Sequence, residues 1–242
     1  MCNASIFSVR WQRRVFGIMV LSLLFFSSDP LGLDFRQQAQ ADQVQSPVPF
    51  VWGYAGKLSY VAGEEVAFHL SSSHTQVAIS IDRVGAERVH MHSEESIAVD
   101  AHPIPDRASS HGCDWPIGHT FTIPDDWKSG YYEVTMTGMK QRSEDGDSPK
   151  ESAEKVNQGM ARGTLFFIVR NRDPATGSRI LLQLSTNTYN AYTNWGGHSL
   201  YSYHDRDGLQ GHRVSFDRPL SSQFGKWELP FVRWAENNGY TL

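Results

Sequence analysis

The chain has 242 residues, 40% of them hydrophobic and 12% aromatic, with 22 Lys and Arg against 26 Asp and Glu. This composition supplies enough apolar surface for a packed core, and it excludes a disordered, collagen-like or disulfide-based chain. The formal net charge of −4 at pH 7 provides no basic field, which argues against a nucleic-acid-binding protein.

Residues 1–41 have the features of a signal peptide. Arg10, Arg13 and Arg14 precede a short apolar run over Val15–Phe26, and a small-x-small cleavage pattern ends at Ala41. An uncleaved membrane anchor is the alternative, but the run is too short to span a bilayer comfortably. We therefore expect an exported protein, periplasmic or extracellular, with no membrane contact after cleavage. The arginine pair leaves both the Sec and the twin-arginine route open.

Alternating segments over residues 46–172 predict an antiparallel β-sandwich of immunoglobulin-like type. Glu65–Ser71 and Gln76–Arg83 each place their apolar side chains on one face. Gly163–Arg170 is apolar on both faces, as expected of a strand that is covered on two sides. Two shorter strands are predicted at Thr120–Ile123 and Tyr131–Thr137.

Two parts of this region carry no strand pattern. His90–Pro105 is irregular and is left unassigned. Lys140–Gly163 is rich in charges and has no aromatic residue, so it cannot bury enough apolar surface to offset its ordering entropy. It predicts a mobile, solvated loop, with a partner-docking segment as the alternative.

After Pro174 the pattern changes to that of an α/β domain over residues 177–242. Arg179–Leu184 predicts a strand and Ser185–Lys226 a long loop. A helix is predicted from about Trp227 to Gly239, and Tyr240–Leu242 predicts the start of another strand. One strand and one helix cannot form a stable parallel sheet. We interpret the domain as incomplete and the chain as part of a longer protein, with a sandwich that carries a helical tail as the alternative.

Two stretches are candidates for a functional site. Ser185–Tyr203 contains four Tyr, one Trp and a Gly pair directly after the predicted strand, where open α/β sheets bind ligands. The alternative is that these aromatic residues pack the two domains together. A zinc or copper site is a second candidate, although its residues lack tight metal-ligand spacing. Its members are His90, His92, His111, Cys113 and His119.

Five motifs in one order carry a resemblance to a known family. They are Gly112–Pro116, Phe121–Tyr132, Asn187–Tyr201, Val214–Pro219 and Glu228–Pro230. From about Tyr54 to Leu242 the chain resembles the large (β) subunit family of N,N-dimethylformamidase. The resemblance implies a β-sandwich followed by an α/β domain similar to the glutamine-amidotransferase fold. It also implies hydrolysis of a small amide substrate at one ferric ion, Fe(III), held by two tyrosines and one glutamate.

The resemblance assigns site residues by motif position. The metal-ligating tyrosines correspond to Tyr132, in a Ser-Gly-x-Tyr element, and Tyr192, in an Ala-Tyr-x-x-Trp-Gly-Gly element. The glutamate of this family lies in a His-Asp-Glu-Tyr-Trp motif beyond this sequence, so we expect this chain to be inactive alone. His198 and Asn194, next to Tyr192, are candidates for proton transfer or substrate binding.

The chemistry of such a site is coherent. A free phenol has a pKa of about 10, so tyrosine becomes an anionic ligand only beside a strong Lewis acid such as ferric iron. That ion would polarise the amide carbonyl and lower the pKa of a bound water.

Alternatives remain open for several of these assignments. Tyr132 shares a strand face with Val134 and Met136, so it is also a candidate for a core tyrosine that braces a turn. Glu228 and Glu236 are candidate replacement carboxylates, but nothing in the sequence aims them at Tyr192. A non-catalytic exported β-sandwich module that binds a carbohydrate or a protein is the alternative function. The resemblance leaves a homo-oligomer or a small subunit open as partners.

Overall fold

The structure is a computed structural model that describes residues 48–139, 160–173, 180–202 and 208–242, all within the unit Val48–Leu242. The predicted signal peptide lies outside the described residues, as does the predicted charged loop up to residue 159. Among the helices of these described ranges, none has the length and apolar character needed to cross a bilayer.

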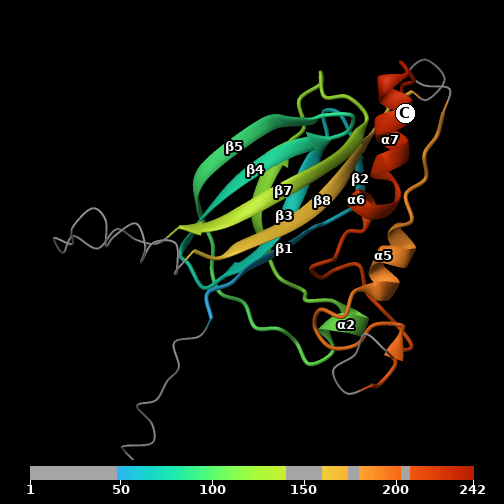
Figure 1. The fold of residues 1–242 in the computed structure, drawn as a ribbon. Coiled ribbons are helices and arrows are strands. Elements are labelled where there is room, and N and C mark those ends of the chain that lie inside the picture. The colour runs from blue at the N-terminus through green and yellow to red at the C-terminus, as the bar shows by residue number, and fades with distance from the viewer. Residues whose placement is uncertain (1–47, 140–159, 174–179, 203–207) are drawn as a thin grey trace, which may run out of the picture. The chain divides into compact units, whose positions relative to one another are not determined.

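The described strands form two sheets that pack into a β-sandwich (Figure 1). One sheet has the order β1-β3-β6, and the other has the order β2-β8-β7-β4-β5. Neighbouring strands are antiparallel except for β2 and β8, which are parallel. The strands are β1 (Val51–Ala55), β2 (Ser59–Val61), β3 (Glu65–Ser72), β4 (Gln76–Val84), β5 (Arg88–Ala98), β6 (Ile117–Thr122), β7 (Gly130–Met139) and β8 (Arg162–Arg170).

The main core lies between the two sheets and follows the alternation of the strands. Successive side chains of a strand point to opposite faces, so every second residue enters the core. Burying each large apolar side chain contributes roughly 1.5–3 kcal/mol. The predicted inward faces of β3 and β4 are confirmed. Their core residues are Val66, Phe68, Leu70, Val77, Ile79 and Ile81, all at most 2% exposed.

A second core lies on the outer face of the five-stranded sheet. Strand β8 contributes Phe167 to the main core and Phe166 to this second one, which explains why its sequence is apolar on both faces. On β7, Tyr131 likewise faces the second core, while Tyr132 faces the first. The helices in this layer are α5 (Thr186–Tyr192), α6 (Phe224–Trp227) and α7 (Leu229–Asn237), and they lie beside β2 and β8 in Figure 1.

The sequence located α7 correctly and missed α5. Pro230 lies at the start of α7 and the helix ends before Gly239, as predicted. The predicted loop over Ser185–Lys226 contains α5, however, so that part of the prediction is wrong. Tyr189 and Asn190 of α5 are buried, and this tertiary packing stabilises a short helix whose Asn and Thr residues give it little intrinsic propensity.

The two strands predicted for the α/β part are not formed in the described residues. Residues 180–184 and 240–242 have no regular secondary structure and belong to neither of the described sheets. The region left unassigned at His90–Pro105 contains most of β5, an edge strand paired with β4 alone. Register shifts in that pairing interrupt the alternation, which is why the sequence showed no period there.

Candidate functional site

Helix α5 and the loop after it hold three of the four predicted site residues. Tyr192 is the last residue of α5, and Asn194 and His198 follow within six residues. Tyr192 and His198 are half-buried, Asn194 is exposed, and the ring of Tyr192 stacks on Tyr201 with centroids 4.3 Å apart. The structure therefore places these residues on one partly accessible segment.

The glycine pair of this loop lets it approach the short helix α2 (Ala108–His111) closely. Gly196 has φ of 76°, and a Cβ at this position would lie 2.8 Å from the Cβ of Ala108. The backbone N–H of Ser109 donates to the carbonyl of Gly196 at 3.2 Å. Only glycine fits both the backbone conformation and the contact.

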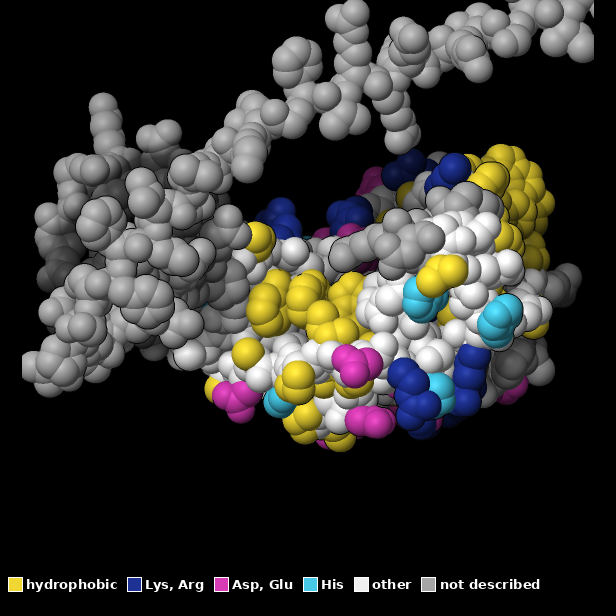
Figure 2. Space-filling model, turned by 90° about the horizontal axis from the view of Figure 1, so that it is seen from below, with side chains coloured by type: hydrophobic (Ala, Val, Ile, Leu, Met, Phe, Trp, Pro, Cys, Tyr) yellow, Lys and Arg dark blue, Asp and Glu magenta, His cyan; other side chains and the backbone are white. Residues whose placement is uncertain are grey.

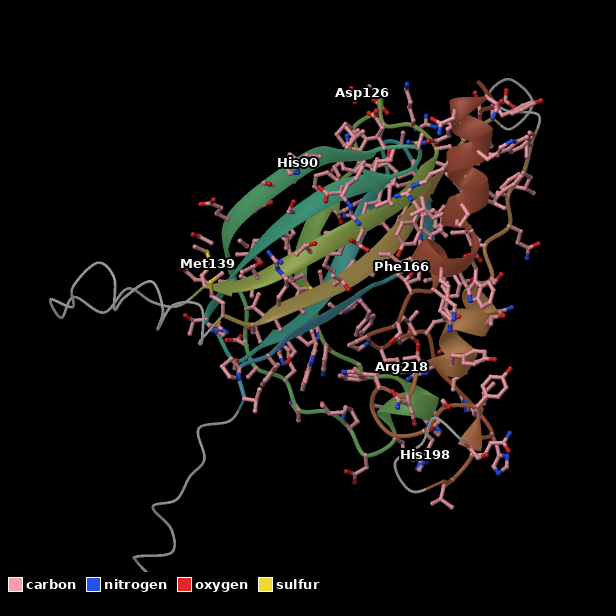
Figure 3. All side chains as sticks on the ribbon, viewed as in Figure 1. His90, Asp126, Met139, Phe166, His198 and Arg218 are labelled. Atoms are coloured by element: carbon pink, nitrogen blue, oxygen red, sulfur yellow. The ribbon has the colours of Figure 1, made fainter. Side chains whose placement is uncertain are left out.

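Arg218 lies beneath the loop and is fully buried. Its Nη1 donates to the carbonyl of Trp195 at 2.6 Å, and its Nη2 donates to the carbonyl of Thr193 at 3.1 Å and to Asn190 Oδ1 at 3.0 Å. Its Nε donates to the carbonyl of Ser215 at 3.0 Å. Figure 3 shows Arg218 and His198 close to α2.

Burial lowers the pKa of Arg218 to about 10, so the guanidinium is charged at neutral pH. A buried cation costs several kcal/mol unless its donors are satisfied. Within the described ranges, the structure shows no carboxylate paired with this guanidinium. Sequence reasoning missed Arg218, although its motif was recognised. The sequence feature that could have indicated Arg218 is its position as the lone arginine of the Val214–Pro219 motif, directly before Pro219.

The Gly112–Pro116 motif packs against the same loop from the other side. Trp115 and Trp195 meet edge to face with centroids 5.7 Å apart. The same cluster also contains Trp52, Tyr54, Ala108 and Cys113. Burial raises the pKa of the Cys113 thiol to about 12, so the thiol is protonated at neutral pH.

The structure does not gather the proposed zinc or copper ligands into one site. His90 lies 3.1 Å from Asp82, and His111 contacts Ser110. His92 and His119 both approach Glu94, whereas Cys113 lies in the aromatic cluster. Within the part of the chain that the structure describes, no group of three or more His, Cys, Asp or Glu is arranged to hold a metal ion.

Tyr132 lies inside the sandwich. Its ring is fully buried and stacked between Trp127 and Phe167, at centroid distances of 4.8 Å and 5.5 Å. Its hydroxyl donates to the backbone carbonyl of Lys128 at 2.6 Å, and burial raises its pKa to about 12. This geometry favours the core tyrosine that braces a turn, and the role of Tyr132 as a metal ligand stays a prediction.

Two buried phenols of the second core make separate hydrogen bonds, one to a carboxylate and one to a serine. The hydroxyl of Tyr189 donates to Glu228 Oε2 at 2.5 Å, and the N–H of Ser185 donates to Glu228 Oε1 at 3.2 Å. The hydroxyl of Tyr131 donates to Ser222 Oγ at 2.8 Å. The pKa of Tyr189 is raised, mainly because its side chain is buried and also because its hydroxyl donates a hydrogen bond to Glu228.

The two candidate replacement carboxylates thus have other partners. Glu228 binds Tyr189, and Glu236 forms an ion pair with Arg83 at 2.5 Å. Glu236 also accepts a hydrogen bond from the backbone N–H of Ala86 at 2.6 Å.

One face of the molecule is of mixed character. On the face seen from below, acidic and basic side chains lie side by side among hydrophobic and histidine side chains (Figure 2).

Comparison with known proteins supports the resemblance read from the motifs. A family model described as N,N-dimethylformamidase beta subunit-like, C-terminal, matches residues 78–242. A search of curated proteins gave no match. The matched region begins within β4 and includes α5, its loop and Arg218, as well as Tyr131, Tyr189 and Glu228. This chain therefore belongs to the N,N-dimethylformamidase beta subunit-like family.

Proposed function

We propose that this protein acts in the hydrolysis of small amides. The observation that carries the proposal is the family match over residues 78–242, which contains the whole α5 loop. In such a reaction water adds to the amide carbonyl and the C–N bond breaks, which releases a carboxylic acid and an amine.

The proposed site is the half-buried segment of Tyr192, Asn194 and His198. Its side chains are accessible enough to meet a small substrate. Asn194 offers both a donor and an acceptor for an amide group, and a histidine can carry a proton at neutral pH. We propose that Asn194 orients the substrate and that His198 moves the proton to the leaving amine.

A ferric ion is part of the proposal, and the described residues fit it only in part. When bound, it would supply Lewis-acid polarisation of the amide carbonyl and of water. Tyr192, at the accessible end of α5, suits a phenolate ligand. Tyr132 as placed does not, because a phenolate has no proton to donate to the Lys128 carbonyl. The described residues therefore support Tyr192 as a ligand more strongly than Tyr132.

Three further features belong to the same proposal. The sandwich is of immunoglobulin-like type, and residues 177–242 belong to an α/β domain similar to the glutamine-amidotransferase fold. The protein is exported after cleavage behind Ala41, as the apolar run over Val15–Phe26 suggests. Sequencing the amino terminus of the exported protein tests the last point, since an intact Met1 would contradict it.

The function is tested with the purified protein. Because this chain is expected to be inactive alone, the assay uses the longer protein that includes the implied glutamate ligand. For that protein we expect release of dimethylamine from N,N-dimethylformamide, together with bound iron and a visible phenolate-to-iron absorption band. Tyr192→Phe should lose both the iron and the band, because the ligand oxygen is removed. The control is Tyr240→Phe, a half-exposed tyrosine after α7 that stacks on Trp234.

The possible results test the ligand role of Tyr192 and the amidase function separately. Retained iron and colour in Tyr192→Phe would remove Tyr192 from the coordination shell. A folded longer protein, with the glutamate present, that has neither iron nor hydrolysis of any small amide would favour the non-catalytic binding module instead.

A further inference from the structure

We propose that Arg218 is a positioning residue, which fixes the end of helix α5 and the loop after it, and so sets where Tyr192, Asn194 and His198 lie. The functional meaning of this role rests on the proposed function, because those three residues form the proposed site. The structural role itself does not depend on it.

The acceptors of Arg218 alternate with the proposed site residues along the chain. Tyr192 lies between Asn190 and Thr193, which both accept from Nη2. Asn194 lies between Thr193 and Trp195, and Trp195 accepts from Nη1. A planar guanidinium reaches these oxygens at once because its donors form a rigid fork, which the single nitrogen of lysine cannot reproduce.

The buried charge of Arg218 is stabilised only while the loop stays in its observed position. Its acceptors in the structure are four backbone carbonyls and the Asn190 side-chain amide oxygen. The carbonyls at a helix C-terminus carry partial negative charge, so a cation there is stabilised only while the helix end stays in place. Movement of the loop would leave a buried cation without its acceptors, which opposes that movement.

The segment that carries Arg218 is hydrogen-bonded to helix α2 and to the residues just after it, and α2 also contacts the glycine pair of the loop. The N–H of Ser215 donates to the carbonyl of Ser109 at 2.9 Å, and the N–H of Cys113 donates to the carbonyl of Asp217 at 2.8 Å. Helix α2 therefore holds the loop at Gly196 and also holds the segment that carries the guanidinium. Helix α2 thus contacts the loop directly at Gly196 and indirectly through the segment that carries Arg218.

The test is hydrogen exchange in Arg218→Lys, which keeps the charge and removes the fork. We expect backbone amides of residues 189–201 to exchange about tenfold faster or more, because local opening becomes easier, while amides of β7 stay unchanged. The matched control is Arg83→Lys, a partly buried arginine paired with Glu236, which should leave residues 189–201 within about twofold. Unchanged exchange in residues 189–201, or an equal increase in β7, would overturn the proposal.

A second variant keeps the test decisive if Arg218→Lys does not fold. Asn190→Ala removes one acceptor of Nη2 and leaves the guanidinium in place. It should raise exchange in the same segment by a smaller factor. No change there would count against the positioning role.

A kinetic measurement adds a readout that general destabilisation would not produce. In the longer protein that includes the implied glutamate ligand, with N,N-dimethylformamide as the substrate, Arg218→Lys should lower kcat about tenfold with KM within about twofold, since misplaced groups lose transition-state contacts. An unchanged kcat would overturn the role in the site. If the unaltered protein hydrolyses no amide, the proposed function fails, while the exchange experiment still decides the structural role.

Discussion

Tyr189 and Glu228 form a hydrogen bond that joins helix α5 to the start of α7, and the tyrosine side chain is fully buried. Removing the hydroxyl leaves a buried carboxylate oxygen without its donor, which costs about 1–3 kcal/mol. We expect Tyr189→Phe to lower the free energy of unfolding by that amount in a denaturant titration. Tyr240→Phe, at a half-exposed ring, should change it by less than about 0.5 kcal/mol. Equal effects of the two changes would show that the hydrogen bond does not stabilise the fold.

At the scale of elements, the turn before β7 is held by Tyr132, whose hydroxyl donates to Lys128 and whose ring stacks on Trp127. Tyr132→Phe keeps the ring and removes one hydrogen bond, so we expect a loss of about 0.5–1.5 kcal/mol with an unchanged denaturant m-value. Iron content should stay the same if the tyrosine only braces this turn. Loss of iron in a folded Tyr132→Phe protein would instead restore the ligand role.

At the scale of the whole molecule, burial raises the pKa of several tyrosines above the value they have in the unfolded chain. Such groups contribute stability that is fully present below the unfolded pKa of about 10 and is lost as pH rises above it. Arg218 acts in the opposite direction, because burial lowers its pKa to about 10. It is one group against six groups whose pKa burial raises, which are five tyrosines and the Cys113 thiol. The five tyrosines are Tyr54, Tyr60, Tyr131, Tyr132 and Tyr189.

We therefore expect the denaturation midpoint to be flat between pH 7 and about 8, to fall slightly from about pH 9 because of Cys113, and to fall more steeply above about pH 10 because of the tyrosines. The part of the tyrosinate absorbance that comes from these five side chains should rise together with unfolding rather than before it. A rise of the full tyrosinate signal in protein that is still folded would contradict the burial of these side chains.

Local patterns in the sequence were sufficient for several strands of the sandwich and for α7, but not for β1, β2 or β5. Alternation of apolar residues located β3 and β4, and Pro230 and Gly239 marked the ends of α7, because each signal acts within a few residues. Helix α5 could not be found in this way. Its seven residues are stabilised by burial of Tyr189 and by acceptance of hydrogen bonds from Arg218, which lies 28 residues from Asn190.

The candidate site was likewise predicted in part from local motifs, and the rest depended on the tertiary structure. By their motifs, the residues themselves determined membership in the N,N-dimethylformamidase beta subunit-like family and pointed to Tyr192, Asn194 and His198 on one segment. Only the tertiary structure decided that Tyr131 and Tyr132, neighbours in sequence, face different cores, and that Arg218 lies under the α5 loop. The reason is physical: a motif fixes which groups are available, whereas which groups meet depends on how the faces of strands and helices are packed together.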